Sequence, residues 1–301
     1  MDKQKTILAV GSIALDTLET PHGNRQDILG GSATYFSISA GLLAPIKLVG
    51  VVGNDYPEEG WQLFQSRNIN TDNILVENGS TFRWGGKYSN DYSTRDTLFT
   101  ELGVFENFSP TIQETDRLSP LVFLGNIQPD LQSSVAQLTP SAEYIVADTM
   151  NLWIDLFPEK LKEVLKLSTI LLINHEEAEQ YTGQSEISNA ASKLLSAGPE
   201  IVVIKKGADG AYLARGESRH SVPVFPINQV DPTGAGDSFA GGFMGYLSQA
   251  DQPDFLEAVM VGSAMASFCV EGFGVESLLQ ATPTLLAHRV ETIKNSMVEK
   301  V

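Results

Sequence analysis

The sequence is poor in cysteine and in basic residues, and both shortages restrict the kind of protein that it can encode. Cys269 is the single cysteine, so no disulfide can form within the chain, as is usual in a reducing cytoplasm. Only 20 Lys and Arg residues stand against 37 Asp and Glu, which gives a formal net charge of −17. This charge disfavours nucleic acid or an anionic membrane surface as the main partner. We therefore expect a cytoplasmic protein that binds no nucleic acid.

Long apolar runs are also missing. No apolar stretch approaches the ~20 residues that a membrane-spanning helix requires, so no membrane partner is expected. Lys3 and Lys5 precede an apolar run from Ile7 to Leu15, as in a short signal peptide. Asp16 interrupts that run early and no clear small-residue cleavage site follows, so a first β-strand is the better interpretation.

What the chain does contain is an alternation of short Val/Ile/Leu runs with amphipathic segments. The expected strands are Thr6–Val10, Lys47–Val52, Leu121–Leu124, Tyr144–Ala147, Thr169–Ile173 and Ile201–Lys205. The expected helices are Ala33–Leu43, Glu58–Arg67, Glu177–Thr182, Ala190–Ala197, Asp237–Ser248, Phe255–Phe268 and Thr284–Met297. This alternation predicts a doubly wound, mostly parallel three-layer α/β sheet. With no repeat, low-complexity segment or linker, residues 1–301 are expected to form one domain.

Residues 81–102 break the rhythm, because β-type alternation surrounds the polar turn Ser-Asn-Asp-Tyr-Ser-Thr-Arg-Asp. This pattern predicts a hairpin outside the main sheet, and residues 13–29 are a further candidate for the same small β unit. An ordinary surface hairpin is the alternative.

The segment from Asp231 to Phe243, Asp-Pro-Thr-Gly-Ala-Gly-Asp-Ser-Phe-Ala-Gly-Gly-Phe, is the most specific motif. Gly234, Ala235 and Gly236 carry almost no side chain, so their N–H groups can turn toward one point. An apolar residue at every fourth position then predicts a helix, whose N-terminus would attract an anion or a developing negative charge. Asp237 falls in the first helical turn, where a carboxylate by itself is often only a partner of the helix dipole.

This segment resembles the C-terminal signature D-T-x-G-A-G-D of the PfkB/ribokinase family of sugar and nucleoside kinases, with Pro232 where Thr is commoner. The resemblance implies the ribokinase-like fold with a small β lid over the acceptor. It also implies that Asp237 is the general base and that the amides of Gly234, Ala235 and Gly236 form the anion hole. Phosphoryl transfer relies on this kind of positioning and charge stabilisation.

Two further segments resemble the acceptor side of the family. Asp16 follows the first strand, where family members have an acid that accepts hydrogen bonds from substrate hydroxyls; a lone Asp there is otherwise a turn former. Gly30, Gly31 and Ser32 resemble the N-terminal Gly-Gly signature, whose glycines let the backbone approach the acceptor. Ser32 and Tyr35 stand where ribokinases carry Lys and Asn, which puts ribose in doubt as the substrate.

On the nucleotide side, Asn174 to Glu177 matches the family's N-x-x-E pattern, which implies that Glu177 helps hold Mg²⁺ through water and that Asn174 lies near the nucleotide phosphates. Lys205-Lys206-Gly207-Ala208-Asp209-Gly210 resembles the nucleotide-binding G-x-x-G loop, with Lys205 where Thr is common, although a plain hairpin turn explains it equally well. No Walker A loop occurs.

Asp231 matches the residue that binds a monovalent cation in potassium-dependent members, with Thr233, Cys269 and Gly272 as carbonyl donors; a helix-capping Asp231 is the alternative.

The resemblance thus implies an ATP- and Mg²⁺-dependent kinase, with K⁺ as a further candidate ion, that phosphorylates a hydroxyl of a sugar or polyol. The expected substrate-binding residues are Asp16, Gly30, Gly31, Ser32, Tyr35, Arg83, Trp84 and Asn126. The expected nucleotide-binding residues are Asn174, Lys205, Gly207, Gly210 and Gly236. An adenosine-kinase-like nucleoside kinase is the alternative within the class, because Tyr35, Phe36, Phe82 and Trp84 could stack on a base. A non-catalytic sugar or nucleoside sensor is the alternative outside it, and a homodimer through the lid is a further expectation.

Overall fold

The computed structural model describes residues 4–92 and 94–298, and its largest element is a twisted sheet. Within these residues the sheet has nine strands in the order β13-β12-β11-β10-β9-β8-β1-β4-β5. The seven strands β11, β10, β9, β8, β1, β4 and β5 pair in parallel, whereas β12 and β13 pair antiparallel at one edge. The expected mostly parallel, doubly wound sheet is therefore confirmed.

The strands of this sheet are β1 (Ile7–Val10), β4 (Ile46–Gly53), β5 (Asn70–Glu77), β8 (Leu121–Leu124), β9 (Tyr144–Asp148), β10 (Ile170–Asn174), β11 (Ile201–Lys205), β12 (Ala211–Arg215) and β13 (Ser218–Val222). The α-helices are α1 (Ser32–Ala40), α2 (Glu58–Ser66), α3 (Pro129–Leu138), α4 (Asn151–Leu156), α5 (Pro158–Leu167), α6 (His175–Thr182), α7 (Ile187–Leu195), α8 (Ala235–Leu247), α9 (Phe255–Cys269) and α10 (Pro283–Val298).

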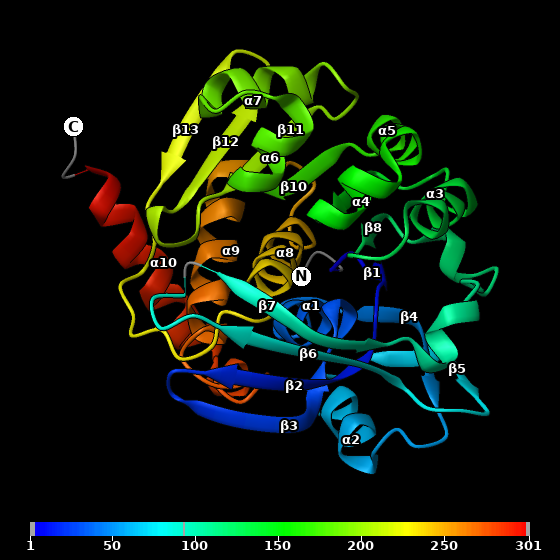
Figure 1. Cartoon of the computed structure of the whole chain (residues 1–301). Coiled ribbons are helices and arrows are strands. Elements are labelled where there is room, and N and C mark those ends of the chain that lie inside the picture. The colour runs from blue at the N-terminus through cyan, green and yellow to red at the C-terminus, as the bar shows by residue number, and fades with distance from the viewer. Residues whose placement is uncertain (1–3, 93, 299–301) are drawn as a thin grey trace.

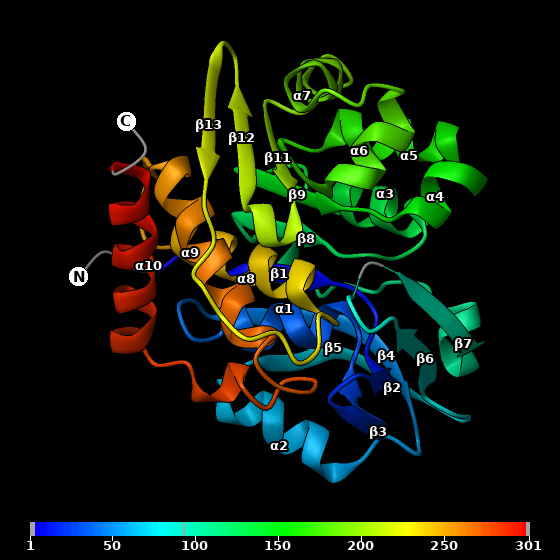
Figure 2. The ribbon, with the colours of Figure 1, turned by 60° about the vertical axis from the view of Figure 1, so that its left-hand side comes forward.

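Helices cover both faces of the sheet, which makes three layers (Figures 1 and 2). Along β1, Ile7 and Ala9 join the core beneath α1, α8 and α9, while Leu8 and Val10 join the core beneath α3, α5 and α7. This division follows from the two-residue period of a strand, because successive side chains point to opposite faces. A strand buried on both faces must be apolar throughout, which is why the central strands are continuous Val/Ile/Leu runs.

A second sheet of four strands, which we call the lid sheet, lies at one side of the large sheet (Figures 1 and 2). Its strands, in spatial order, are β3 (Gly23–Gly30), β2 (Ala14–Thr20), β6 (Phe82–Tyr88) and β7 (Arg95–Glu101). The expected hairpin at 81–102 is present as β6 and β7, and the candidate segment 13–29 supplies most of the other two strands. The parallel pairing of β2 with β6 joins the two hairpins.

Among the described residues, no helix is both long and apolar enough to cross a bilayer.

Candidate active site

The site begins at the carboxyl ends of the parallel strands. Asp148 ends β9, Asn174 ends β10, Lys205 ends β11, and Asn126 follows β8 by two residues. Because β8 to β11 are neighbours and all parallel, these residues meet along one edge of the sheet, where ligands bind in open α/β folds. The N-terminus of α8 lies against the same edge, since a Cβ added at Gly236 would come within 3.1 Å of Lys205 Nζ.

The segment before α8 has the geometry that its glycines predict. Gly234 is the N-cap of α8 with φ 75°, a left-handed conformation that an L side chain rarely adopts. A Cβ there would also overlap the ring of Tyr35, so only glycine fits. No side chain caps α8. The Ala235 N–H donates to the Pro232 carbonyl at 3.2 Å, whereas the backbone contacts recorded among the described residues include none from the Gly234 or Gly236 N–H, which suits these two amides to an anion.

Asp237 lies in the first turn of α8. Burial raises the pKa of its carboxyl to about 7; Asp148 adds to the rise, while the positive charge of Lys205 opposes it. A carboxyl that gains and loses its proton near neutral pH is suited to accept a proton from a substrate hydroxyl.

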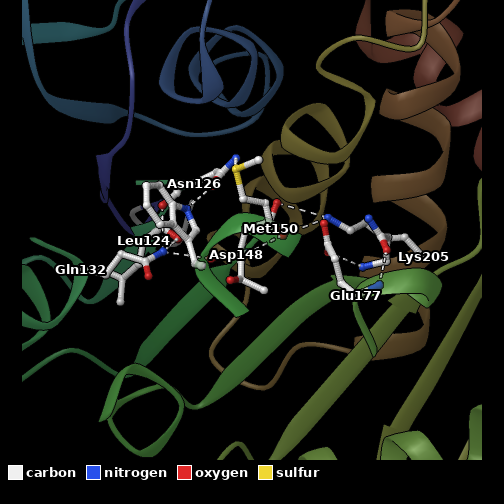
Figure 3. Close-up of polar contacts among 11 residues, drawn as sticks. Leu124, Asn126, Gln132, Asp148, Met150, Glu177 and Lys205 are labelled. Carbon is white, nitrogen blue, oxygen red and sulfur yellow. Dashed lines mark hydrogen bonds and ion pairs between the residues drawn. The ribbon is translucent and has the colours of Figure 1, made fainter. Parts of the chain in front are cut away.

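Asp148 and Lys205 form a largely buried ion pair, in which Lys205 Nζ lies 3.1 Å from both carboxylate oxygens (Figure 3). Burial works against the charge of Lys205, but the carboxylates of Asp148 and Glu177 outweigh it and raise the pKa of the lysine. The sequence analysis did not select Asp148. Its only signal was an acid directly after a strand, at the edge where the other site residues were expected.

Asn174 and Glu177 form a capping box at the start of α6. The Glu177 N–H donates to Asn174 Oδ1 at 2.8 Å, and the Asn174 N–H donates to Glu177 Oε2 at 3.0 Å. The motif therefore starts a helix, and it also places Glu177 close enough to Asp148 for the two charges to interact. Burial, with the charge of Asp148, raises the pKa of Glu177 to about 7. Among the described residues, no group of three or more His, Cys, Asp or Glu is arranged to hold a metal ion.

The predicted glycine loop is the hairpin between β11 and the antiparallel β12. Gly207 and Gly210 have φ of 56° and 89°, as a tight turn requires, and the Lys206 N–H donates to the Gly210 carbonyl at 2.7 Å. Lys205 at its start points into the site, toward Asp148.

On the acceptor side, Asp16 lies on β2 of the lid sheet and is 3% exposed. Burial is the main cause that raises the pKa of Asp16 to about 7, and the negative charges of Asp231 and Asp237 add to the rise. A hydrogen bond from the Gly31 backbone to the carboxylate works in the opposite direction and lowers the pKa. Gly30 lies so close that a Cβ there would overlap the Asp16 carboxylate. The glycine pair therefore makes room for Asp16 as well as starting α1.

Ser32 and Tyr35 are both engaged within the protein. The Ser32 N–H donates to Ser12 Oγ, and the Ser12 N–H donates to Ser32 Oγ, both at 3.1 Å. Tyr35 is 1% exposed and its ring packs beneath Gly234. The Tyr35 ring therefore packs against the glycine that starts α8, while its buried hydroxyl has no hydrogen-bond partner recorded among the described residues. Its expected contact with an acceptor stays a prediction.

The lid sheet presents different residues on its two faces. Trp84 pairs with Asp16 in the register of β2 and β6, so both side chains lie on the same face. Tyr88 shares this face, and its hydroxyl lies 2.9 Å from Thr233 Oγ1, just before the anion-hole segment.

Arg83 points to the opposite face and binds Asp55 at 2.9 Å and Asp27 at 3.2 Å. Arg83 is therefore engaged away from the cleft, in contrast to the expected acceptor contact.

Asp231 is fully buried and braces two loops. Its Oδ1 accepts from the Thr233 N–H at 2.9 Å, and its Oδ2 accepts from the Gly274 N–H at 3.3 Å. The Cys269 thiol donates to the Thr233 carbonyl at 3.3 Å. Asp231, Thr233 and Cys269 thus lie together, and the contacts recorded among the described residues tie the loops to each other. The Cys269 contact involves its thiol, so the cation site expected from the Thr233, Cys269 and Gly272 carbonyls stays a prediction.

A three-layer α/β fold with a lid sheet, an acid at a glycine-rich helix N-terminus and a second acid beneath the lid define the architecture of a small-molecule kinase. The model of the pfkB family carbohydrate kinases matches residues 7–282. This chain therefore belongs to the PfkB family and is a phosphotransferase of the sugar and nucleoside kinase class.

Relatives that match most of this chain and most of their own length include two kinases. A cytidine kinase of Thermococcus kodakarensis is 29% identical over 250 residues, which cover 81% of this chain and 88% of that protein. A nucleoside kinase of Methanothermobacter thermautotrophicus is 26% identical over 298 residues, 94% of each chain.

Among solved structures, the nucleoside kinase of Methanocaldococcus jannaschii has a TM-score of 0.78 at 21% identity and covers 96% of this chain and 99% of that one. A putative ribokinase II of E. coli has a TM-score of 0.80 at 20% identity, covering 97% and 99%. These structures agree with the ribokinase-like fold.

Proposed function

We propose that this protein transfers the γ-phosphoryl group of ATP to a hydroxyl of a nucleoside or a related sugar. The observation that carries the proposal is the position of Asp237, in the first turn of α8, beside the uncapped amides and with a pKa raised to about 7. A general base next to a preorganised anion site is the combination that phosphoryl transfer to an alcohol needs.

In this mechanism Asp16 accepts hydrogen bonds from acceptor hydroxyls and so orients the acceptor. The reacting hydroxyl oxygen forms a bond to the γ-phosphorus, the bond to the β–γ bridging oxygen breaks, and ADP leaves. The hydroxyl proton passes to Asp237. The amides of Gly234, Ala235 and Gly236 stabilise the charge on the transferred oxygens, as positioning and electrostatics dominate this reaction.

The nucleotide phosphates would lie along the strand ends, near Asn174, Lys205 and the Gly207–Gly210 hairpin. Magnesium, when bound, would neutralise phosphate charge. Because it keeps several waters and takes few protein ligands, the absence of a three-residue cluster among the described residues is compatible with it. Glu177 fits a water-mediated contact, since the Asn174 N–H occupies only one side of its carboxylate.

A monovalent cation at Asp231 is a separate, weaker proposal. The buried carboxylate accepts two backbone hydrogen bonds and has further lone pairs for a cation, and the Thr233 carbonyl lies close by. If the site binds potassium, potassium should activate the enzyme more than lithium does.

A nucleoside is the acceptor that we favour over a simple sugar or polyol. The support is that the relatives matching most of both chains are named cytidine kinase and nucleoside kinase. Phe36 stacks on Phe123 in the core and Phe82 stacks on Phe105, so neither ring is free to hold a base. Trp84 lies on the same face of the lid sheet as Asp16, and the Arg95 guanidinium, 5.1 Å from the ring centroid, covers one side of its ring. The other side of the Trp84 ring is the better candidate for that contact. The cytoplasmic location and a dimer through the lid stay predictions.

The test is ATP turnover across a panel of nucleosides, sugars and polyols, with each acceptor also titrated by calorimetry. We expect acceptor-dependent ADP release, with nucleosides giving the highest kcat/KM. Tight binding of one member without turnover of any would instead support the sensor. Turnover of sugars alone would support the proposed kinase activity and contradict the proposal that the acceptor is a nucleoside.

A further inference from the structure

Trp153 on α4 fixes the orientation of the Asn126 side chain. The indole Nε1–H donates to Asn126 Oδ1 at 2.7 Å. An indole nitrogen can only donate, whereas an amide carries an acceptor on one side and a donor on the other. The amide must therefore present its oxygen to Trp153 and direct its NH₂ group elsewhere, which removes the usual ambiguity between the two ends of an asparagine.

The backbone that carries Asn126 is equally fixed. Gln132 of α3 is fully buried, and its Nε2 lies 3.1, 2.8 and 2.9 Å from the carbonyl oxygens of Leu124, Gly125 and Asp148, so its two hydrogens are shared among three acceptors (Figure 3). The Gly125 N–H donates to the Val10 carbonyl at 2.8 Å. These contacts connect the ends of β1, β8 and β9, so they fix the backbone next to Asn126.

Asn126 also lies between the two halves of the site. A Cβ added at the preceding Gly125 would come within 3.3 Å of Ser32 Oγ, at the start of α1 on the acceptor side. On the other side, Asn126 Nδ2 donates to Met150 Sδ at 3.2 Å, and Met150 follows Asp148 by two residues (Figure 3). Asn126 is half-buried, so it is not fully enclosed by these neighbours.

The NH₂ group has two hydrogens, and sulfur is a weak acceptor for one of them. In the part of the chain that the structure describes, Met150 Sδ is the only recorded partner of Asn126 Nδ2. The geometry points to Trp153 as a positioning residue that holds the Asn126 amide as a hydrogen-bond donor to the acceptor substrate. The site would then select acceptors that present an oxygen or an unprotonated ring nitrogen at this point.

This inference rests on the proposed kinase function, and it adds a residue that the sequence motifs do not include. The segment from the end of β9 into α4 would then serve both substrates: Asp148 on β9 pairs with Lys205 on the phosphate side, and Trp153 on α4 would set the donor on the acceptor side.

The experiment combines Trp153→Phe, Asn126→Ala and their double variant, with kcat and KM measured separately for the best acceptor of the panel. Trp153→Phe keeps an aromatic ring against Phe157 and removes only the N–H. We expect each single variant to raise the acceptor KM roughly 3- to 10-fold, the share of one hydrogen bond, and to leave the KM for ATP unchanged. The double variant should be no worse than Asn126→Ala, because Trp153 acts through Asn126.

Two further variants sharpen the result. Asn126→Asp keeps an oxygen for Trp153 but offers no donor, so it should raise the acceptor KM at least as much as Asn126→Ala. Trp61→Phe, a tryptophan of α2 that packs edge-on against Tyr56, is the matched control and should behave like the parent.

If the fold-increases in acceptor KM of the two single variants multiply in the double variant, Trp153 acts by packing and not through Asn126. With a parent protein that turns over the acceptor, this result would overturn the inference. An unchanged acceptor KM in Trp153→Phe would do the same. If the parent binds an acceptor without turnover, the proposed function fails, and calorimetry on the same variants then tests the inference by itself. A parent that binds no acceptor overturns both.

Discussion

Asp237 has the two properties that a general base needs, proximity to the anion site and a pKa near neutrality, and both can be tested at one residue. We expect Asp237→Asn to lower kcat by about 10²- to 10⁴-fold, the usual contribution of general base catalysis. The isosteric amide should leave ATP binding unchanged. Asp130→Asn, an exposed acid on α3, is the control and should keep the parental kcat. Near-parental kcat in Asp237→Asn would show that another group is the general base.

The raised pKa of Asp237 also predicts the pH dependence of the rate. Burial is the main cause of its rise to about 7, and the carboxyl must be deprotonated to accept a proton. The rate should therefore fall as the pH decreases below about 7 and level off above it. The measurement is log kcat/KM against pH at constant ionic strength, and a profile that is flat from pH ~5.5 to ~8 would contradict the assignment.

Individual residues were predictable where a motif surrounds them. Asp237 and Asp16 come with glycines that the backbone needs, and the motifs identified both. Asp148 and Trp153 carry no such local signal. The partner of Asp148 is 57 positions away, and that of Trp153 is 27 positions away, so only the fold reveals either contact.

At the scale of elements, strands buried on both faces were the most predictable. β8 and β11 have the bounds expected from their apolar runs. α3 was missed because Gln132 and Ser133 are buried on it, which weakens its apolar period. α4 has 6 residues, too few to show a helical period. The lid sheet was only partly visible, because its central pairing of Ala14 with Phe82 joins distant hairpins.

The lid contacts the anion-hole segment directly. Tyr88 OH lies 2.9 Å from Thr233 Oγ1, and Tyr92 OH donates to the Val230 carbonyl at 2.8 Å. A lid that is held closed keeps water away from the transferred group.

Tyr88→Phe should therefore loosen the lid, lower acceptor phosphorylation roughly 2- to 10-fold and raise the ratio of ATP hydrolysis to transfer. Tyr56→Phe is the control, because its hydroxyl has no recorded partner among the described residues. Both products are measured in one assay. An unchanged ratio in Tyr88→Phe would mean that this contact does not govern closure.

At the scale of the whole molecule, five of the 37 Asp and Glu residues lie near one another where catalysis is proposed. The carboxylates of Asp16, Asp148, Glu177, Asp231 and Asp237 interact electrostatically around one cleft, and Lys205 pairs with Asp148. The net charge of −17 follows from the composition, but the proximity of these five acids could not be predicted, because they come from separate elements. Holding buried acids together costs stability when they ionise.

That cost predicts how stability depends on pH. Burial raises the pKa of Asp16, Glu177 and Asp237 to about 7, while in the unfolded chain these groups titrate near 4. Between these values the folded state binds more protons than the unfolded state, so this contribution to stability is complete below about pH 4 and is lost as the pH rises toward 7. Asp55 and Asp116 act in the opposite direction, because burial is outweighed by hydrogen bonds that lower their pKa.

Replacing one of the acids whose pKa is raised by its amide should remove part of the stability loss that accompanies a rise in pH. We expect Asp16→Asn to have a higher Tm than the parent near pH 8, where Asp16 must ionise, and a similar Tm near pH 5, where the folded carboxyl is already neutral. Thermal denaturation of both proteins across this range checks the prediction, with Asp130→Asn as an exposed control. A Tm difference that is the same at both pH values would show that the substitution acts through packing and not through the charge of Asp16.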